Sequence, residues 1–348
     1  MKKQGSRPAD KKRQKLPGKR TGRKTKKRSV LFVSSEAVPF SKSGGLADVC
    51  GALPKALAER GHDVRVVIPR YWCINPADKK TVIGSMGVPM GTGTVWCKVL
   101  GKSAGKVKYY FIEHDGYFGR AGLYDDGKWE YPDNAERFGF FSKAAIQLAK
   151  DISFRPDIVH CNDWQSALVP AYLKIEETSN PFFAETASVF TIHNIAHQGV
   201  FPREKYPFLA LGEENFTEPK FESWGKIHFM KGAIFYADAI TTVSPSYAGE
   251  ILSPEGAMGL APYLERRKED ISGILNGADY EKWDPSKDEI IPAGYSLKDM
   301  SGKAECKKAL QKEFGLEISP DVPVIGMVTR LAHQKGLDLV APVIKDIV

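Results

Sequence analysis

The chain has 348 residues, 42% of them hydrophobic and 11% aromatic, which is enough to bury two cores or a single large one. No apolar run is long enough to cross a membrane and no segment resembles a signal peptide, so we expect neither feature. The formal net charge of +8 is unevenly distributed: residues 1–29 sum to +13, and the rest of the chain therefore sums to −5.

Residues 1–28 form a basic tail with almost no apolar side chains, so we predict that it is disordered and builds no core. Three interpretations of this tail remain open: an arm that binds nucleic acid or another polyanion, a transit peptide, or a disordered solubilising extension. A transit peptide fits poorly, because the segment is rich in Lys, poor in Ser and has no amphipathic apolar face. We favour the solubilising extension.

The cysteines are scattered and odd in number: Cys50, Cys73, Cys97, Cys161 and Cys306. None has the CxxC spacing that is typical of a zinc site, and the set does not indicate a disulfide framework. This usage of cysteine favours a reducing, cytoplasmic location.

The first predicted element is a strand over 29–35, whose residues are mostly apolar and β-branched. A glycine turn follows, and then a helix that we predict to run through about residue 60. A second strand is predicted over 63–69, after a Gly-His pair that suits the end of a helix. Strand, helix and strand make a β-α-β unit, which predicts a parallel sheet.

The glycine turn, with Gly44 and Gly45, lies between a strand and the start of a helix. Unpaired backbone N–H groups and the helix dipole favour an anion at such a place. Lys42 adds a full positive charge. The turn therefore predicts a ligand that carries phosphate.

The same alternation continues along the chain: strands within 81–113, one of them over 107–112, a helix over 134–150, a strand over 156–162 that leads into a helix from 163, and strands over 188–194 and 239–245. Ligands of open α/β sheets bind at the carboxyl ends of the strands. We therefore expect the polar residues that follow these strands to converge on one rim of the sheet: Lys42, Asp163, His193, Asn194 and Ser244.

The composition of the sequence changes after Asn276. Residues 283–302 are rich in Pro, Gly and Asp and are predicted to connect two domains, followed by a helix over 303–314, a strand over 323–329, a turn over 330–336 and a helix from 337. One strand and parts of two helices cannot bury a core of their own. We therefore interpret residues 277–348 as the truncated start of a second domain.

Six motifs occur in order: residues 42–49 (KSGGLADV), 161–164 (CNDW), 193–199 (HNIAHQG), 242–248 (TVSPSYA), 276–277 (NG) and 329–336 (TRLAHQKG). Together they resemble bacterial glycogen synthase and plant starch synthase over residues 29–348. The resemblance implies an α/β fold of the GT-B type, with a Rossmann-like N-terminal domain over 29–276 and a second Rossmann-like domain that begins at 277. It implies retaining transfer of glucose from ADP-glucose to the non-reducing end of an α-1,4-glucan such as glycogen, without a metal ion or other cofactor.

The resemblance also implies roles for individual residues. Lys42 and the turn of Gly44 and Gly45 match the family's contact with the nucleotide sugar, and Ser43 replaces a usual Thr, a change that keeps the hydroxyl. Further residues are implied to bind substrate: Asp48, Asp163, Asn194 and Asn276. Asn276 matches a residue at the domain hinge.

His193 matches a histidine near the transferred sugar, where we expect it to position the substrate, with its backbone carbonyl facing the anomeric carbon, rather than to act as a simple base. Arg330 and Lys335 match a pair of cations that stabilise the leaving diphosphate.

Some matched residues have an equally good structural interpretation. Asp163 either binds a sugar hydroxyl or caps a helix, and Trp164 is expected to pack rather than to stack on a sugar. Tyr131, Asp133 and Asn134 resemble a segment near the acceptor, but a loop and helix cap explains them as well.

The family's second domain carries a Glu-Pro-x-Gly segment and a Gly-rich nucleotide contact that do not occur in this sequence. We therefore expect little or no synthase activity from these 348 residues alone. Two alternatives remain open: a catalytically inactive glucan-binding module, and another GT-B transferase such as a sucrose-related enzyme, against which the Lys42 turn argues. The choice between ADP-glucose and UDP-glucose also stays open.

Overall fold

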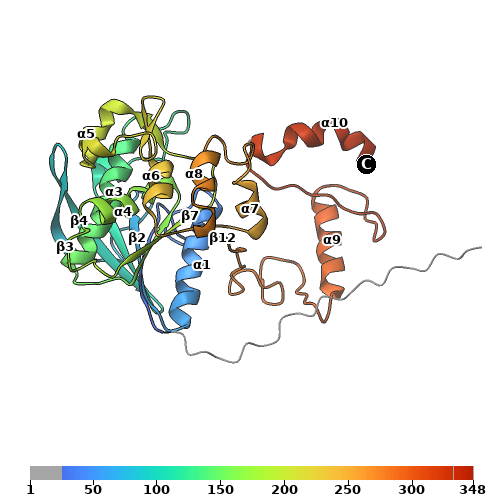
Figure 1. Ribbon diagram of the computed structural model, residues 1–348. Helices are drawn as coiled ribbons and strands as arrows, with labels where there is room; N and C mark the ends of the chain where they lie inside the picture. Colours follow the sequence, from blue (N-terminus) through green and yellow to red (C-terminus); the bar gives the residue numbers. More distant parts are fainter. Residues whose placement is uncertain (1–25, 332, 348) are drawn as a thin grey trace, which may run out of the picture. The chain divides into compact units, whose positions relative to one another are not determined.

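The computed structural model describes residues 26–331 and 333–347, so the predicted disorder of the basic tail lies almost wholly outside the described residues. The chain divides into two compact units, one up to Gly277 and one from Ala278 onward (Figure 1). None of the helices in the described part of the chain is long and apolar enough to cross a membrane.

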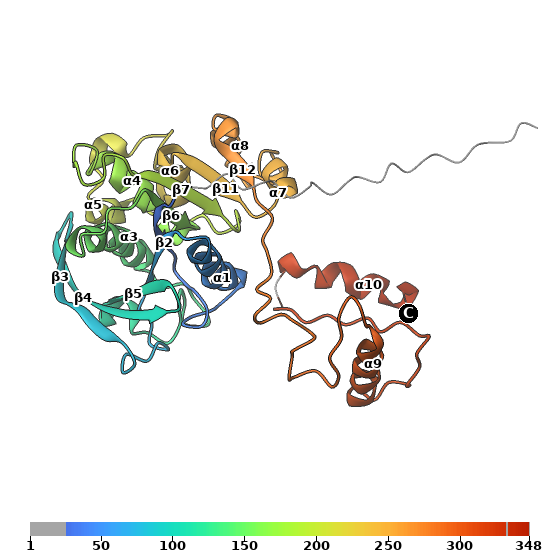
Figure 2. The ribbon, with the colours of Figure 1, turned by 90° about the horizontal axis from the view of Figure 1, so that it is seen from below.

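The first unit is built on a nine-stranded sheet with the order β12-β11-β7-β6-β1-β2-β5-β4-β3 (Figure 2). The strands from β12 to β5 in this order are parallel, and β4 and β3 extend the sheet in antiparallel fashion. The strands are β1 (Ser29–Val33), β2 (Asp63–Pro69), β3 (Lys80–Met90), β4 (Gly93–Ala104), β5 (Val107–Glu113), β6 (Ile158–Asn162), β7 (Ala187–Ile192), β11 (Ala239–Thr242) and β12 (Ile271–Gly273).

The predicted parallel sheet is therefore confirmed, and β2 has the predicted bounds. The strand β1 shows why the prediction succeeds. Leu31, Phe32 and Val33 are fully buried, because a central parallel strand is covered on both faces and reads as a continuous apolar run. The strands β7 and β11 end earlier than predicted, because their last polar residues already belong to the loops, whereas β6 ends as predicted but begins at Ile158 rather than at 156.

Helices connect and cover the parallel strands. They are α1 (Gly45–Glu59), α2 (Asp115–Phe118), α3 (Asn134–Asp151), α4 (Leu168–Ile175), α5 (Tyr206–Leu209), α6 (Phe229–Tyr236), α7 (Pro245–Glu250) and α8 (Ala261–Glu265), with short 3₁₀ turns η1 (Trp164–Ser166), η2 (Arg203–Lys205), η3 (Glu213–Asn215) and η4 (Lys268–Asp270). The predicted helices α1 and α3 are confirmed within one or two residues. Most of α3 is buried, including Phe138, Phe140 and Phe141.

A second, three-stranded antiparallel sheet has the order β8-β10-β9 and consists of β8 (Val200–Pro202), β10 (Lys226–His228) and β9 (Glu222–Ser223). The sequence analysis does not predict it, because its strands are only two or three residues long. Such short strands show no periodicity that distinguishes them from a loop.

The second unit contains α9 (Ser301–Glu313), the 3₁₀ turn η5 (His333–Lys335) and α10 (Leu337–Ile347), and both helices are confirmed. The predicted strand over 323–329 is wrong, because these residues have no regular secondary structure. A strand needs a hydrogen-bonded neighbour, and residues 278–331 and 333–347 contain no second strand that could supply one.

Candidate functional site

Four neighbouring parallel strands, β11, β7, β6 and β1, bring their carboxyl ends to the same edge of the large sheet. The chain leaves β1 towards β2 on one side, whereas β6 pairs with β1 on the other side. A crevice at such a switch in strand order is the usual ligand position of an open α/β sheet. The ends of these strands thus lie on one edge of the sheet, and we call this edge, with residues 34–48, 162–163, 193–196 and 244, the rim.

The glycine turn stands at the end of β1. Lys42 Nζ donates to both carboxylate oxygens of Asp48, at 2.8 and 2.7 Å, and both side chains are partly exposed. A Cβ atom added to Gly44 or Gly45 would meet nothing within 4 Å, so open space adjoins the turn. An exposed ion pair contributes only about 0–1 kcal/mol, so Lys42 can exchange Asp48 for a phosphate at little cost.

Glu36 holds the turn from inside and is a residue that the sequence analysis missed. It is 2% exposed, and its carboxylate accepts hydrogen bonds from the backbone N–H and, at 2.9 Å, from the hydroxyl of Ser43. The hydroxyl of Tyr124 adds a third contact at 3.3 Å. Burial raises the pKa of Glu36, whereas the hydrogen bonds from Ser43 and Tyr124 lower it. The only signal in the sequence is an acid placed directly after a buried strand.

Asp163 holds the loop after β7. Its Oδ1 accepts hydrogen bonds from the backbone N–H of His193 at 2.8 Å and of Asn194 at 3.4 Å. Asp163 occupies the N-cap position of η1, but its side chain makes no capping hydrogen bond there, so of the two alternatives the side-chain cap is excluded. Asp163 is 7% exposed, and burial raises its pKa to about 7. Its backbone has a φ of +53°, a left-handed conformation that is uncommon outside glycine.

The imidazole of His193 is fixed by Asn162, the last residue of β6, which the sequence analysis did not single out. His193 Nε2 lies 2.9 Å from Asn162 Oδ1, and Asn162 Nδ2 donates to the carbonyl of Val33 at 3.0 Å. The Asn162 oxygen is thus the acceptor, so Nε2 carries the proton and Nδ1 has a free lone pair. Burial lowers the pKa of His193 to about 3, so the ring is neutral at pH 7.

Three further predicted residues of the first unit make hydrogen bonds with the backbone of nearby loops or helices: Asn194, Ser244 and Asn276. Asn194 Oδ1 accepts from the N–H of Ala196 at 3.0 Å, and Ser244 caps α7 by accepting from the N–H of Tyr247 at 3.0 Å. The N–H of Asn276 donates to the carbonyl of Val243 at 3.3 Å. Trp164 is 8% exposed and packs against Phe138, so its predicted packing role is confirmed.

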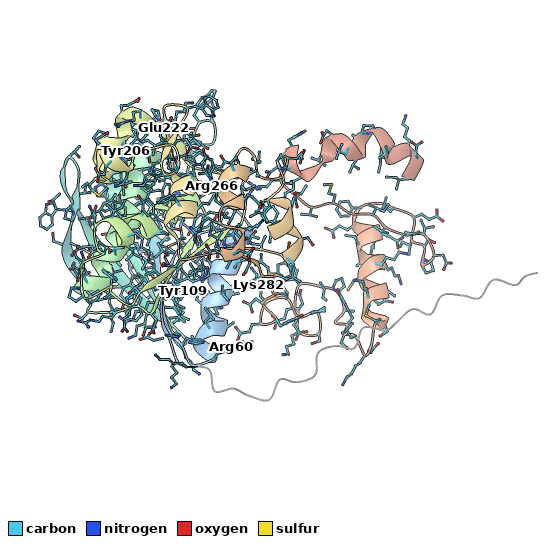
Figure 3. The ribbon with its side chains drawn as sticks, viewed as in Figure 1. Arg60, Tyr109, Tyr206, Glu222, Arg266 and Lys282 are labelled. Carbon is cyan, nitrogen blue, oxygen red and sulfur yellow. The ribbon has the colours of Figure 1, made fainter. Side chains whose placement is uncertain are left out.

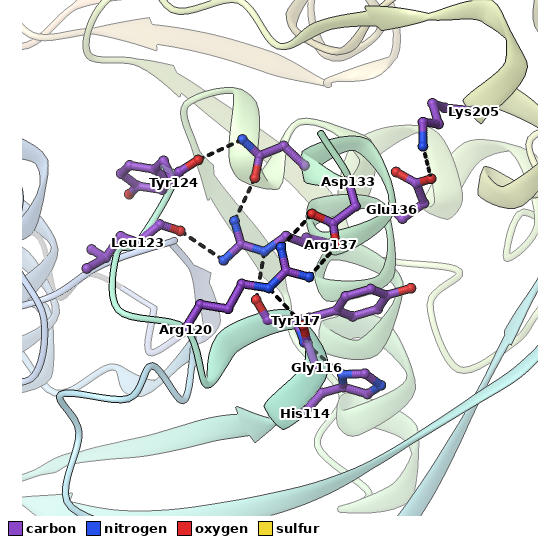
Figure 4. Close-up of polar contacts among 11 residues, drawn as sticks. His114, Gly116, Tyr117, Arg120, Leu123, Tyr124, Asp133, Glu136, Arg137 and Lys205 are labelled. Carbon is purple, nitrogen blue, oxygen red and sulfur yellow. Dashed lines mark hydrogen bonds and ion pairs between the residues drawn. The ribbon is translucent and has the colours of Figure 1, made fainter. Parts of the chain in front are cut away.

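Tyr131, Asp133 and Asn134 are not on the rim but at the start of α3, which begins at Asn134. Figure 4 shows Asp133 beside Arg120. Asp133 pairs with Arg120 through two hydrogen bonds of 2.7 and 2.5 Å, and its side chain makes no capping hydrogen bond to α3. Asn134 is fully buried and accepts from Arg137 at 2.6 Å.

Arg330 and Lys335 belong to the second unit, where both side chains are exposed and Lys335 lies in η5. The residues that the structure brings together are therefore those of the first unit. Across residues 26–331 and 333–347, no three His, Cys, Asp or Glu side chains are grouped so that they could hold a metal ion.

The fold is that of a known class. The chain is similar in structure to the catalytic domain of starch synthase IV from Arabidopsis thaliana, solved with ADP and acarbose bound. The TM-score is 0.82 at 30% sequence identity, over 92% of this chain and 66% of that chain. The predicted α/β fold of the GT-B type is thus confirmed.

Sequence comparisons narrow the class to one family. The family model for the starch synthase catalytic domain matches residues 29–266. A glycogen synthase of Anaeromyxobacter dehalogenans is 48% identical over 90% of this chain, and one of Geotalea daltonii is 46% identical over 89% of it. The chain therefore belongs to the starch synthase catalytic domain family. It spans 65% and 64% of the length of these two relatives.

Proposed function

We propose that this chain takes part in retaining transfer of glucose from ADP-glucose to the non-reducing end of an α-1,4-glucan, as in glycogen synthesis. The observation that carries the proposal is the rim. There the glycine turn after β1, the Asn162–Asp163 pair after β6 and the His193–Asn194 pair after β7 stand on three adjacent strands. Membership of the starch synthase family supports the choice of donor and acceptor.

In this proposal the turn of Lys42, Gly44 and Gly45 receives the diphosphate of the donor. The open space beside both glycines lets the ligand approach the backbone closely. Lys42 leaves its exposed pair with Asp48 and contacts the phosphate oxygens, while Glu36 keeps the turn in shape from the buried side.

His193 positions the transferred sugar. A histidine whose pKa is about 3 is not in its imidazolium form at pH 7, so it is not a general acid. Its free Nδ1 can accept a hydrogen bond from a sugar hydroxyl, because Asn162 holds Nε2 in the protonated form. Asp163 acts through backbone: it fixes the N–H groups of His193 and Asn194, and thereby the direction of the His193 carbonyl.

We assign Arg330 and Lys335 to the charge that develops on the departing diphosphate, with residues 277–348 as the start of the second GT-B domain. An arginine can grip two phosphate oxygens and a lysine adds a point charge. Asn276 would mark the hinge. A cytoplasmic location suits the five cysteines, all of which are free thiols.

The test is a glucosyl-transfer assay on the native protein with ADP-glucose labelled in the sugar and glycogen as acceptor, and with UDP-glucose as a competing donor. Transfer from ADP-glucose supports the proposal. Lys42→Ala should then lower kcat/KM roughly 10- to 100-fold, because it removes a charge-assisted hydrogen bond to the donor. Lys106→Ala, at an exposed lysine in the turn between β4 and β5, is the matched control and should leave kcat/KM unchanged.

Two results would speak against the proposal. Binding of glycogen without any transfer would favour the glucan-binding module instead. Transfer that is equally fast in the Lys42→Ala and Lys106→Ala variants would remove the glycine turn from the donor site.

A further inference from the structure

Tryptophan in this chain is exposed far more often than in ordinary proteins, where it is mostly buried. Five of the six tryptophans are more than half exposed: Trp72 (56%), Trp96 (62%), Trp129 (77%), Trp224 (97%) and Trp283 (61%). Trp224 is the extreme case, because its side chain is almost completely in contact with solvent. Such a side chain contributes next to nothing to the folded core.

Trp224 also occupies a backbone position that its residue type disfavours. Ser223 of β9 pairs with Lys226 of β10, so Trp224 and Gly225 form a two-residue hairpin turn. Both have positive φ, +52° and +73°, which is the signature of a type I′ turn. Asn, Asp or Gly is preferred at the first central position of this turn, and a bulky side chain is an outlier there.

The turn is nevertheless held firmly. The N–H of Gly225 donates to Glu222 Oε1 at 2.7 Å, and the carbonyl of Glu222 accepts from the ammonium of Lys231 in α6. Lys231 is fully buried, and its Nζ lies 4.5 Å from the centre of the Tyr263 ring. The hydroxyl of Tyr263 in turn contacts Glu218 at 2.5 Å. Glu222, labelled in Figure 3, is the link between the turn and this support. A strained conformation that its surroundings maintain is typical of a functional position.

The residues that flank Trp224 along the chain are small or polar. Gly225 and Lys226 are exposed, and Ser223 and Glu222 are half-buried. Protein interfaces of standard size bury roughly 1,200–2,000 Å² and contain several clustered apolar anchors. A single indole among polar groups fits a smaller partner better: a pyranose ring, whose C–H face stacks on the indole while its hydroxyls meet the neighbouring polar groups.

The hairpin is joined to the loop that follows the rim. The backbone N–H groups of Phe229 and Met230, directly after β10, donate to the carbonyls of Gly199 and Gln198 at 2.9 and 3.0 Å. His228 adds a contact of 2.9 Å to the side chain of Gln198. The support of Trp224 is therefore continuous with the segment that begins at His193.

We propose that Trp224 is a stacking platform for a glucose ring of an α-glucan, at a binding position separate from the rim. The choice of an α-glucan as ligand rests on the proposed function, whereas the assignment of a binding position rests on the exposure, the strain and the support of Trp224. The platform holds the polymer and takes no part in the transfer step.

The experiment measures the dissociation constant of maltoheptaose and the retardation of the native protein in glycogen-containing gels. Trp224→Asn should weaken both at least about fivefold and at the same time raise the melting temperature, because Asn-Gly is the preferred pair in this turn. Trp224→Tyr should retain binding within about twofold. Trp96→Ala is the matched control, because the Trp96 ring lies over Gly87 of the neighbouring strand, and it should change neither quantity of glucan binding.

Two outcomes would overturn the inference: unchanged glucan binding in Trp224→Asn, or an equal loss in Trp96→Ala. The transfer assay separates this failure from that of the proposed function. If binding depends on Trp224 but no donor supports transfer, the platform stands and the transferase does not. If transfer proceeds but Trp224→Asn binds like the wild type, the opposite holds.

Discussion

The polar side chains of the rim act largely on the backbone of the loops that they adjoin. Glu36 binds the N–H of Ser43, Asp163 binds the N–H groups of His193 and Asn194, and Asn162 binds the carbonyl of Val33. Loops at the end of a sheet have no ladder to satisfy their peptide groups, so buried side chains must do so. The shape of the rim therefore depends on residues that need not touch a ligand.

The protonation of Asp163 is expected to couple stability to pH. Its pKa is about 7 in the folded protein and 3.8 in a model peptide, so between these values the folded state binds the additional proton. Asp163 thus contributes stability at low pH that is lost as the pH rises through 7. Asp163→Asn keeps an oxygen that can accept the same two hydrogen bonds but does not titrate. We expect its free energy of unfolding, relative to the wild type, to increase from pH 5 to pH 8 by up to about 3 kcal/mol.

Urea unfolding at pH 5, 6, 7 and 8 measures this difference. Asp157→Asn is the matched control, because Asp157 also accepts from a backbone N–H, that of Ser29 at 2.7 Å, but its pKa is lowered by that bond. Its effect should stay constant over the same range. A constant effect of Asp163→Asn would mean that the carboxyl does not take up a proton there.

The brace by Glu36 is expected to matter for the donor. Glu36→Gln keeps one acceptor oxygen and loses the second, so Ser43 and Gly44 should become more mobile. If the proposed function holds, KM for ADP-glucose should rise roughly 3- to 10-fold, as for the loss of one hydrogen bond to a charged group, with less change in kcat. Hydrogen exchange at the amides of residues 43–44 should accelerate whether or not the protein is a transferase.

Glu59→Gln, at an exposed position at the end of α1, serves as the control for this variant. Exchange at residues 43–44 that is as slow in Glu36→Gln as in Glu59→Gln would show that the turn keeps its shape without the carboxylate.

At the scale of elements, a single buried arginine ties the segment before α3 to the helix. The guanidinium of Arg137 donates to the carbonyls of Tyr117 at 2.7 Å and Leu123 at 2.9 Å, and to the side chain of Asn134 (Figure 4). The residue is fully buried, and burial lowers the pKa of the guanidinium. This segment also carries Tyr124, which contacts Glu36, so the network extends to the rim.

We expect Arg137→Met to be strongly destabilising. It keeps most of the apolar volume but removes the donor from three oxygens, one buried and two partly buried, each at a cost of about 1–3 kcal/mol, so the loss should be about 3 kcal/mol or more. Arg120→Met breaks the partly exposed pair with Asp133 and an exposed hydrogen bond to the carbonyl of Gly116, and should cost only about 1–2 kcal/mol. Urea unfolding of both variants measures the contrast, and an equal loss in the two would contradict the central role of Arg137.

For the molecule as a whole, the sequence predicts the parallel sheet well and its details less well. Short segments rich in apolar and β-branched residues, such as 29–33 and 63–69, identify buried strands, because local pattern and burial agree there. The sequence does not predict the sheet β8-β10-β9 or the contact of Glu36 with the glycine turn, because both depend on contacts with other parts of the chain. The strand expected over 323–329 fails for the same reason: its pattern suits a strand, but no partner strand is described beside it.

Acid is expected to destabilise the first unit. Burial lowers the pKa values of His160, His193 and His228 to about 4, 3 and 4, from 6.5 in a model peptide. Between these values the unfolded state binds more protons, so stability is lost as the pH falls below 6.5. Each histidine lowers the free energy of unfolding by up to about 2 kcal/mol between pH 6.5 and 5. The opposite effect of Asp163 offsets the contribution of one of the three histidines.

Urea unfolding at pH 7 and pH 5 checks this expectation. His228→Asn should reduce the difference, because Asn does not titrate and can still cap α6 as His228 does through the N–H of Lys231. A wild-type protein that is equally stable at both pH values would show that these histidines are not held neutral by the fold.

The strand order also determines when β1 can complete its pairing during synthesis. β1 needs β6 as its second neighbour, and the bond from Asn162 to Val33 spans 129 residues. At ribosomal speeds of about 5–20 residues per second, one edge of this apolar strand waits roughly 6–26 s for its partner to be made. During that interval Leu31, Phe32 and Val33 lack one of their two neighbouring strands, so we expect chaperones to bind this apolar segment of the nascent chain before the rim exists.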